Sequence, residues 1–309
     1  MAAITTLAPV FFMLVLGMLA HKFNWVSKEH KEGANAVVFN ILFPILVFKL
    51  LATATISFEH IWIILYVFVA YSLAIVLGKL LLPKLVPEFG PVAPYLLACC
   101  EGGSVALPLY LSIVGTSSNT VIFDIAGTAM CFGVINVLVA KECSAGASMG
   151  ELVKNILSNS FVIAVLLGLA LNFTGIYGSL MASSFGEAIT ACLQQATNPI
   201  VGMILFILGF DLSIDKETLV PILKMMGVKT VYYAIVIAGF FVLFPSYMSD
   251  HIFMMAPLIY FMCPTGFGLL PIVSPLYRNK QDKVLTSGFV SMYIFVTLIV
   301  YVCVVLFVA

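Results

Sequence analysis

Ten apolar stretches follow one another along this chain of 309 residues, and they constrain its fold more than any other feature. They lie at residues 4–20, 34–55, 61–82, 91–114, 120–140, 156–174, 188–210, 220–244, 252–276 and 284–308. A helix needs about 20 residues to cross the hydrocarbon core of a bilayer. Because only 9% of the residues are charged, the chain cannot cover a water-facing surface. The sequence predicts an all-α membrane protein with ten transmembrane helices.

The placement of the basic residues provides a separate test of this count. Lys49 lies inside the second stretch, and the other thirteen basic residues are assigned to connections that follow odd-numbered stretches. These thirteen are Lys22, Lys28, Lys31, Lys79, Lys84, Lys141, Lys154, Lys216, Lys224, Lys229, Arg278, Lys280 and Lys283. By the positive-inside rule we expect those connections in the cytoplasm and both termini outside. The equal numbers of acidic and basic residues argue against a nucleic-acid partner.

The two halves of the chain share a pattern of prolines and glycines. Residues 93–108 read APYLLACCEGGSVALP, and residues 256–271 read APLIYFMCPTGFGLLP. Without a gap, the Ala-Pro and Leu-Pro pairs coincide, and Gly103 falls on Gly266. Each half contains five stretches, so the second half enters the membrane from the opposite side. We therefore expect two inverted five-helix repeats, 1–145 and 146–309, which is a common construction of secondary transporters.

Glycine and proline at the centres of the fourth and ninth stretches predict that both helices are broken. Glycine costs about 1 kcal/mol inside a helix, and proline also removes a hydrogen bond. Two simple proline kinks are the alternative. Unwound backbone in a membrane is buried in protein or lines a cavity, so we expect the broken helices to cross at mid-membrane and to bind substrate. The candidate substrate-binding residues there are Gly102, Gly103, Ser104, Pro108, Thr265, Gly266 and Gly268.

Glu101 lies near the middle of the fourth stretch, beside the expected break. A charged side chain at that depth costs at least about 2.5–3.5 kcal/mol on insertion scales. Three interpretations remain open: a proton carrier, a ligand for a coupling cation such as sodium, or a neutral structural carboxyl group. The first two make Glu101 a candidate for coupling transport to an ion gradient.

Three further polar residues are candidates. Lys49 either extends its ammonium group to the membrane surface or faces the cavity and attracts an anion. Asp124, near the outer end of the fifth stretch, either lines the same cavity as a second ion-coupling residue or caps an interfacial helix end. Asn198 precedes Pro199, as Asn40 precedes Pro44, and is a weaker candidate for substrate binding.

Metal and enzyme chemistry find little support in the sequence. The seven cysteines show no metal-ligand or disulfide spacing. No HExxH pattern is present, and no histidine lies within a stretch to act as a base. We expect no enzymatic activity, no bound metal and no cofactor, with a sodium ion at Glu101 as the open exception.

Several short motifs resemble those of the auxin efflux carrier family. Residues 40–48, NILFPILVF, look like the second-helix pattern of that family. Leu107-Pro108-Leu109 with Gly115 is similar to its broken fourth helix, and Pro264-Thr265-Gly266 to the ninth. The motifs Ala98-Cys99-Cys100 and Gly102-Gly103 are also similar to motifs of the related bile acid:sodium symporters. The family usually has Asn at the position of Glu101 and a small or neutral residue at that of Lys49.

The resemblance implies a crossover fold with a support domain of helices 1, 2, 6 and 7 and a transport domain of helices 3–5 and 8–10. It also implies transport of small organic anions such as dicarboxylates, commonly by homodimers. The leading hypothesis is a secondary transporter for a small organic anion in a bacterial inner membrane, coupled to a proton or sodium gradient. A channel or a membrane sensor for a small anionic ligand on the same fold is the alternative.

Overall fold

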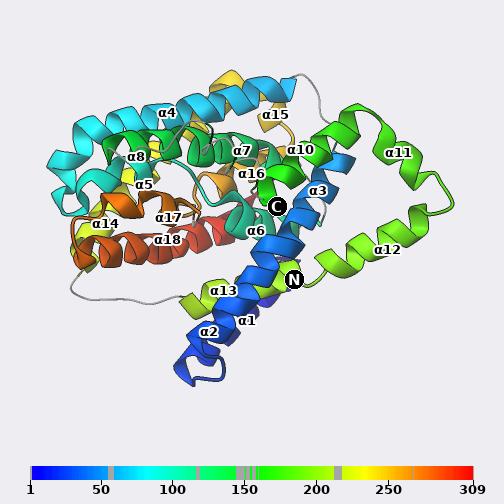
Figure 1. Cartoon of the computed structure of the whole chain (residues 1–309), viewed down its shortest axis with the longest axis horizontal. Coiled ribbons are helices and arrows are strands. Elements are labelled where there is room, and N and C mark those ends of the chain that lie inside the picture. Colours follow the sequence, from blue (N-terminus) through cyan, green and yellow to red (C-terminus); the bar gives the residue numbers. More distant parts are fainter. Residues whose placement is uncertain are drawn as a thin grey trace.

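The computed structural model of the protein describes residues 2–54, 59–115, 119–143, 160–211, 218–266 and 268–308, together with residues 150, 154 and 158. Every regular element in these ranges is a helix (Figure 1). Six helices among the described residues are long and apolar enough to cross a membrane: Lys28–Thr53, His60–Leu85, Asn119–Glu142, Gly186–Ile207, Leu219–Leu243 and Lys280–Phe307. The all-helical membrane character is therefore confirmed. The ten-span count, the inverted topology and the placement of the termini stay predictions.

The first half of the chain contains two helices with π turns and one interrupted helix. Its elements are α1 (Ala2–Lys22), α2 (Lys28–Val37), η1 (Val38–Leu42), α3 (Phe43–Thr53), α4 (Glu59–Leu85), η2 (Pro87–Val92), α5 (Ala93–Leu97), η3 (Gly102–Ala106), α6 (Leu107–Val114), α7 (Asn119–Thr128), η4 (Ala129–Ile135) and α8 (Asn136–Glu142). The π turn η1 directly precedes Pro44. Proline cannot donate a backbone hydrogen bond to the preceding turn, and the helix accommodates this loss by widening there.

The second half begins with shorter helices and ends with the longest one. Its elements are α10 (Ser160–Phe173), α11 (Ile176–Met181), α12 (Gly186–Thr197), α13 (Ile200–Asp211), α14 (Leu219–Leu243), α15 (Pro245–Met248), α16 (His251–Tyr260), α17 (Leu269–Val273), η5 (Ser274–Leu276) and α18 (Lys280–Phe307). Asn279 caps α18 by accepting a hydrogen bond from the backbone N–H of Asp282 at 3.1 Å.

The helices pack in two groups (Figure 1). In one group α1 lies along α13 and α3 lies along α10. In the other, α4 packs against α5 and α7, and α18 packs against α14 and α16. The segments η3 and α6 also contact α13 of the first group. That the two groups move as a support domain and a transport domain stays a prediction.

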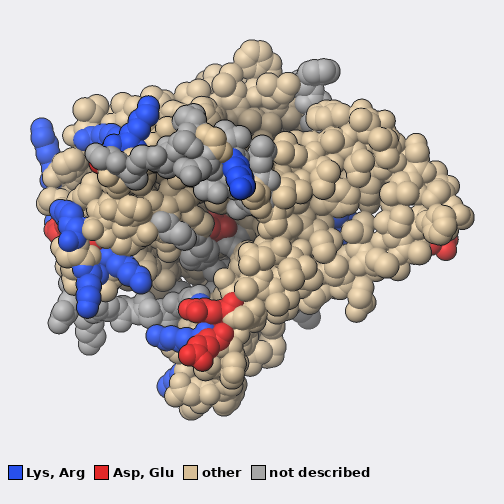
Figure 2. All heavy atoms as spheres, in the orientation of Figure 1, with Lys and Arg blue, Asp and Glu red and all other residues tan. Residues whose placement is uncertain are grey.

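Charged residues are sparse on the face shown in Figure 2, and most of its surface is uncharged. Basic side chains gather at the end of the molecule formed by α4, α14 and α18. One lysine does not fit the expected pattern. Lys229 was assigned to a connection, but it lies within α14 and is 0% exposed. That assignment is wrong, because the residue is about 15 Å along the helix from its first residue.

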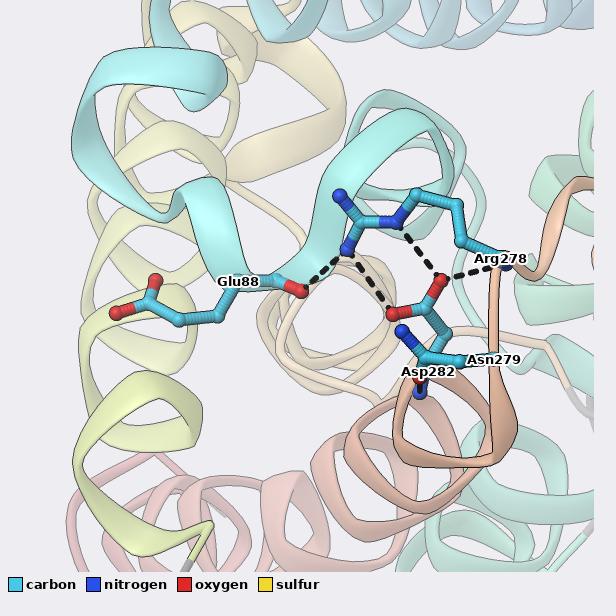
Figure 3. A network of polar contacts seen from close by, with 4 residues as sticks. All are labelled: Glu88, Arg278, Asn279 and Asp282. Atoms are coloured by element: carbon cyan, nitrogen blue, oxygen red, sulfur yellow. Dashed lines mark hydrogen bonds and ion pairs between the residues drawn. The ribbon is translucent and has the colours of Figure 1, made fainter.

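Arg278 joins the two halves of the chain at one end of the second group (Figure 3). Its Nη2 donates to the Glu88 carbonyl and to Asp282 Oδ1, each at 3.0 Å, and its Nε donates to Asp282 Oδ2 at 3.0 Å. The hydrogen bonds to Asp282 raise the pKa of the Arg278 guanidinium. Gly90 has a φ of +55° and packs against this guanidinium, so a side chain there would displace it. The connection before α5 is thus held against the connection before α18.

Candidate functional site

Both helices predicted to be broken are interrupted, and the two interruptions touch. In the first half α5 ends at Leu97 and η3 begins at Gly102; in the second half α16 ends at Tyr260 and α17 begins at Leu269. The backbone N–H of Glu101 donates to the Pro264 carbonyl at 2.7 Å. In the ungapped alignment of the halves these two residues occupy the same position, so the hydrogen bond joins equivalent points of the two aligned segments. We call this contact region the crossover, residues 98–106, 261–266 and 268.

The backbone at the first interruption is strained. Cys99 has a φ of +59°, in the left-handed region that a non-glycine residue rarely adopts. Such a conformation persists only where the surroundings fix it. Here the carbonyl groups freed at the end of α5 have found partners from other helices, which hold the unwound segment in place.

Lys229 supplies the largest share of those partners. Its Nζ donates to the Cys99 carbonyl at 3.0 Å, to the Leu96 carbonyl at 3.4 Å and to Thr265 Oγ1 at 3.0 Å. The rings of Tyr233 and Tyr293 lie 5.0 and 5.6 Å from the ammonium, which adds cation–π attraction. These residues form the Lys229 cluster: Lys229, Leu96, Cys99, Thr265, Tyr233 and Tyr293.

The chemistry of the Lys229 cluster is that of a capped helix end. The C-terminal carbonyls of a helix carry partial negative charge, which a cation stabilises. Thr265 also donates to the Leu96 carbonyl, and Tyr233 Oη donates to the Leu97 carbonyl at 2.8 Å. Since the ammonium is 0% exposed, it holds the crossover together and is not available to a substrate in this conformation.

On a different part of the crossover, two carboxylates lie near the start of η3. Asp124 lies against Gly102, the residue that follows Glu101. Gly266 lies beside Glu101, since a Cβ built on it would be 3.4 Å from Glu101 Oε2. This segment therefore has acidic character, and it suits a proton or a cation better than a free anion.

A chain of hydrogen bonds connects Asp124 with the unwound backbone. The Cys100 N–H donates to Tyr71 Oη at 3.2 Å, and Tyr71 donates to Tyr260 Oη at 2.9 Å. Tyr260 in turn donates to Asp124 Oδ1 at 3.4 Å. This chain, the tyrosine relay, joins α4, α16 and α7 to the break, so the position of Asp124 depends on the conformation of Cys100.

A narrow hollow lies between α3, η3 and α7, and Asp124 is on its wall. It has about 150 Å³ of empty space, which includes its opening to the outside. The lining residues are Phe43, Val47, Gly102, Gly103, Leu107, Thr120, Val121 and Asp124. A Cβ on Gly102 would collide with the Asp124 carboxylate, and one on Gly103 with the Phe43 ring. Glycine is required at both positions because other groups approach the backbone so closely. We call this space the Asp124 hollow.

The remaining candidates lie in different surroundings. Pro108 is buried in the first turn of α6, and Gly268 is exposed where α17 begins. Asn198 is exposed at the junction of α12 and α13. Lys49 is half-buried in α3. The side chain of Ser104 lies outside the described residues.

Lys229 and Thr120 belong to this region, but the sequence did not predict them as site residues. Lys229 lies well inside an apolar stretch and is followed by Thr230, Tyr232 and Tyr233, a polar and aromatic pattern that could have indicated burial. Thr120 gave no comparable signal, since a single threonine at a helix start is common. Among the described residues no group of three or more His, Cys, Asp or Glu side chains could hold a metal ion.

Comparison with known proteins gives a family match for the first part of the chain. Residues 2–145, slightly less than half of the 309 residues, match the sequence profile of a family described as membrane transport protein. This match supports the resemblance to the auxin efflux carrier family. The matched residues include the first interruption and every residue of the Asp124 hollow. No curated protein matches the chain.

The match and the six apolar helices among the described residues support a multi-pass integral membrane protein. The matched family is one of membrane transport proteins. The crossover, with its polar groups between two interrupted helices, is the candidate transport site.

Proposed function

We propose that this transporter moves a small organic anion, a mono- or dicarboxylate, across a bacterial inner membrane by alternating access, coupled to a proton or sodium gradient. The contact between the two interrupted helices, made by the Glu101 N–H and the Pro264 carbonyl, carries the proposal. Helices interrupted at equivalent positions of two repeats are typical of substrate sites in secondary transporters.

The substrate would approach the crossover from the side of the first helix group. The N-terminus of η3 faces α3 there through Gly103 and Phe43, and a helix N-terminus attracts negative charge. Lys49 lies on α3, and its ammonium would add attraction for a carboxylate. The residues Gly102, Gly103, Ser104, Pro108, Thr265, Gly266, Gly268 and Asn198 are the wider set proposed to shape the site.

Glu101 would supply the coupling, with Asp124 as the second acidic group. Two carboxylates close together in a low-dielectric region repel each other, so binding of a proton or cation is favoured. Release of that charge on the other side of the membrane would tie substrate movement to the gradient. A homodimer is the proposed assembly, by resemblance to the family.

The substrate class is tested first with purified protein. A panel of mono- and dicarboxylates, with and without sodium, should contain compounds that raise the transition temperature, because a ligand stabilises the state that binds it. The same compounds should then show saturable counterflow in liposomes. Uptake without saturation or counterflow would favour the channel alternative, and ligand binding without any flux would favour a sensor.

Coupling is tested with Glu101→Gln in the same liposomes. We expect gradient-driven accumulation to be lost while counterflow of the substrate continues, because exchange needs no net ion movement. Glu187→Gln, in the first turn of α12, is the matched control and should accumulate substrate normally. Gradient-driven accumulation by Glu101→Gln at the level of the unmodified protein would contradict the coupling role.

Lys49 is tested by its effect on substrate affinity. Lys49→Ala should raise the apparent KM for the anion about tenfold, which corresponds to about 1.4 kcal/mol of lost attraction. Lys224→Ala, an exposed lysine in α14, is the control and should leave KM unchanged. An unchanged KM in Lys49→Ala would mean that this lysine only reaches toward the membrane surface.

A further inference from the structure

A single side chain, Lys229, connects three segments that meet at the crossover. Lys229 lies on α14, and its Nζ donates to the Leu96 and Cys99 carbonyls, where α5 ends, and to Thr265 Oγ1 in the second interruption. Leu96 and Thr265 belong to different halves of the chain. The contacts of one nitrogen atom therefore hold the two interruptions together and attach both to α14.

The geometry of these contacts requires three donated protons. The hydroxyl proton of Thr265 is directed at the Leu96 carbonyl, so Thr265 Oγ1 acts as an acceptor toward Lys229. All three oxygen atoms around Nζ therefore accept hydrogen bonds. A protonated lysine has three N–H donors, whereas the neutral amine has two and a lone pair. Without the third proton the lone pair would face an oxygen atom, and one of the three contacts would become repulsive.

The groups around the ammonium bring no counter-charge. The Tyr233 and Tyr293 rings, from α14 and α18, lie 5.0 and 5.6 Å from Nζ. At neutral pH a phenol or a thiol is ordinarily uncharged. Among the described residues no carboxylate forms an ion pair with Lys229, so the ammonium depends on its oxygen and ring contacts for stabilisation. The remaining titratable side chains that act on it are the thiols of Cys99, Cys100 and Cys263.

We propose that Lys229 is a proton-binding latch of the crossover. With its third proton bound, Lys229 holds α14 and the two interruptions together in the conformation described above. Transfer of that proton to water breaks one N–H bond, leaves the electron pair on Nζ and produces a hydronium ion and a neutral amine. The amine cannot satisfy three acceptors, so the crossover loosens. The ligand of this site is a proton, and its release allows the interrupted helices to move relative to α14.

Release of the latch acts on strained backbone. Cys99 has a φ of +59°, and the bond from Lys229 to its carbonyl helps to fix that conformation. Once this bond is lost, Cys99 can return to the backbone regions that a residue with a side chain prefers. We therefore expect the first movement in the unwound segment that follows α5.

A permanently charged structural lysine would make the same contacts, but its charge would not respond to pH. Two substitutions separate these cases. A guanidinium group is not deprotonated in proteins, so Lys229→Arg should keep the latch closed at every pH. A glutamine side chain is uncharged and has two N–H donors, so Lys229→Gln should resemble the released state at every pH.

The experiment measures the labelling of the crossover cysteines by N-ethylmaleimide in the purified full-length protein. Cys99, Cys100 and Cys263 are 2%, 4% and 0% exposed, so they react when the crossover opens. Mass spectrometry of their peptides gives the labelling rates from about pH 6 to about pH 9. Because thiols react faster at higher pH in any variant, rates are compared between variants at the same pH. The exposed Cys192 serves as the reference.

The latch predicts a difference that grows with pH. At about pH 9 the crossover cysteines of the unmodified protein should react at least about tenfold faster than those of Lys229→Arg, whereas at about pH 6 the two proteins should be equally protected. Lys229→Gln should react rapidly at both pH values. Lys224→Arg, exposed on the same helix, is the matched control and should follow the unmodified protein. Cys192 should react alike in all of them.

Equal pH dependence in the unmodified protein and in Lys229→Arg would overturn the latch, because the charge of Lys229 would then not change. If the larger arginine side chain prevents folding, Lys229→Gln decides. Its crossover cysteines must react faster than those of the unmodified protein at about pH 6, and the difference must shrink toward about pH 9. A difference that stays constant with pH, or no difference at all, would indicate a purely structural lysine or none that matters here, and either overturns the proposal.

The role of the latch in coupling transport to a proton gradient rests on the proposed function, whereas proton binding by Lys229 does not. The labelling needs no substrate, so the two can fail separately. Labelling whose pH dependence requires Lys229, in a protein that transports no carboxylate, refutes the anion transporter and leaves the latch standing. Carboxylate counterflow by a protein whose labelling has the same pH dependence in Lys229→Arg does the reverse.

Discussion

The Lys229 cluster and the Asp124 hollow are two polar regions of one crossover, and they differ in how completely their groups are paired. The ammonium of Lys229 has three hydrogen-bond partners and two aromatic rings around it. In the hollow, Thr120 Oγ1 has no partner and the bond from Tyr260 to Asp124 is long. Polar groups that are all hydrogen-bonded hold one conformation, whereas a polar group without a partner can still bind a ligand. The Lys229 cluster is therefore suited to a structural role and the Asp124 hollow to contact with a ligand.

The largest expected effect is at the Lys229 cluster, where the ammonium group is fully paired. Lys229→Met removes the cation from the end of α5 and leaves the Leu96 and Cys99 carbonyls with fewer partners. We expect a loss of about 3 kcal/mol or more in the free energy of unfolding, and loss of transport. Thermal unfolding in detergent checks the first and liposome uptake the second.

A control for that experiment is Lys224→Met on the same helix, which removes an exposed lysine and should change stability by less than about 0.5 kcal/mol. Normal stability in Lys229→Met would mean that the crossover does not depend on this cluster, and the contrast between the two regions would lose its basis.

The next largest effect is expected on transport, in a variant at the Asp124 hollow. Gly102→Ala places a methyl group where the Asp124 carboxylate lies, so it should fill the hollow and reduce transport at least about tenfold. Gly227→Ala, where a Cβ would have nothing within 4 Å, is the matched control and should transport normally. Initial uptake rates per folded protein provide the measurement. Full activity in Gly102→Ala would show that the hollow has no part in transport.

The smallest expected effect is at the tyrosine relay, which connects the Asp124 hollow with the unwound backbone. Tyr260→Phe removes the donor to Asp124 and the acceptor for Tyr71, and should cost about 1–2 kcal/mol of unfolding free energy. If the relay supports the crossover, transport should also fall in this variant. Tyr301→Phe removes a hydroxyl bonded to Ser112 elsewhere, and should lower stability while leaving transport unchanged.

Much of the fold and part of the site follow from local features of the sequence. Apolar length predicts helices, and the glycines and prolines at 102–108 and 264–271 predict the interruptions, because both are properties of one segment of chain. Glu101 is recognisable because a charge in an apolar stretch is expensive wherever the segment packs. The family resemblance rests on the same local motifs, and the profile match over residues 2–145 supports it for that part of the chain.

The burial of Lys229 does not follow from such local features of the sequence. Its charge fits the pattern of basic connections, and only the helix boundaries and the packing of α14 against the crossover show that it is buried. Asn198 is a candidate because of its position before a proline. It lies exposed at a helix junction, and its role in substrate binding stays a prediction.

The sequence by itself determined a helical membrane protein, two matching interruptions and, over residues 2–145, a match to a family of membrane transport proteins. Only the tertiary structure decided which polar groups share a space. Lys229 meets carbonyls more than 120 residues earlier, since Cys99 is 130 positions away. Thr120 meets Gly102 and Phe43 from different helices around one hollow. Such sites depend on distances between segments, which hydrophobic length and local propensity do not encode. They arise only when the helices pack and bring polar groups from different segments together.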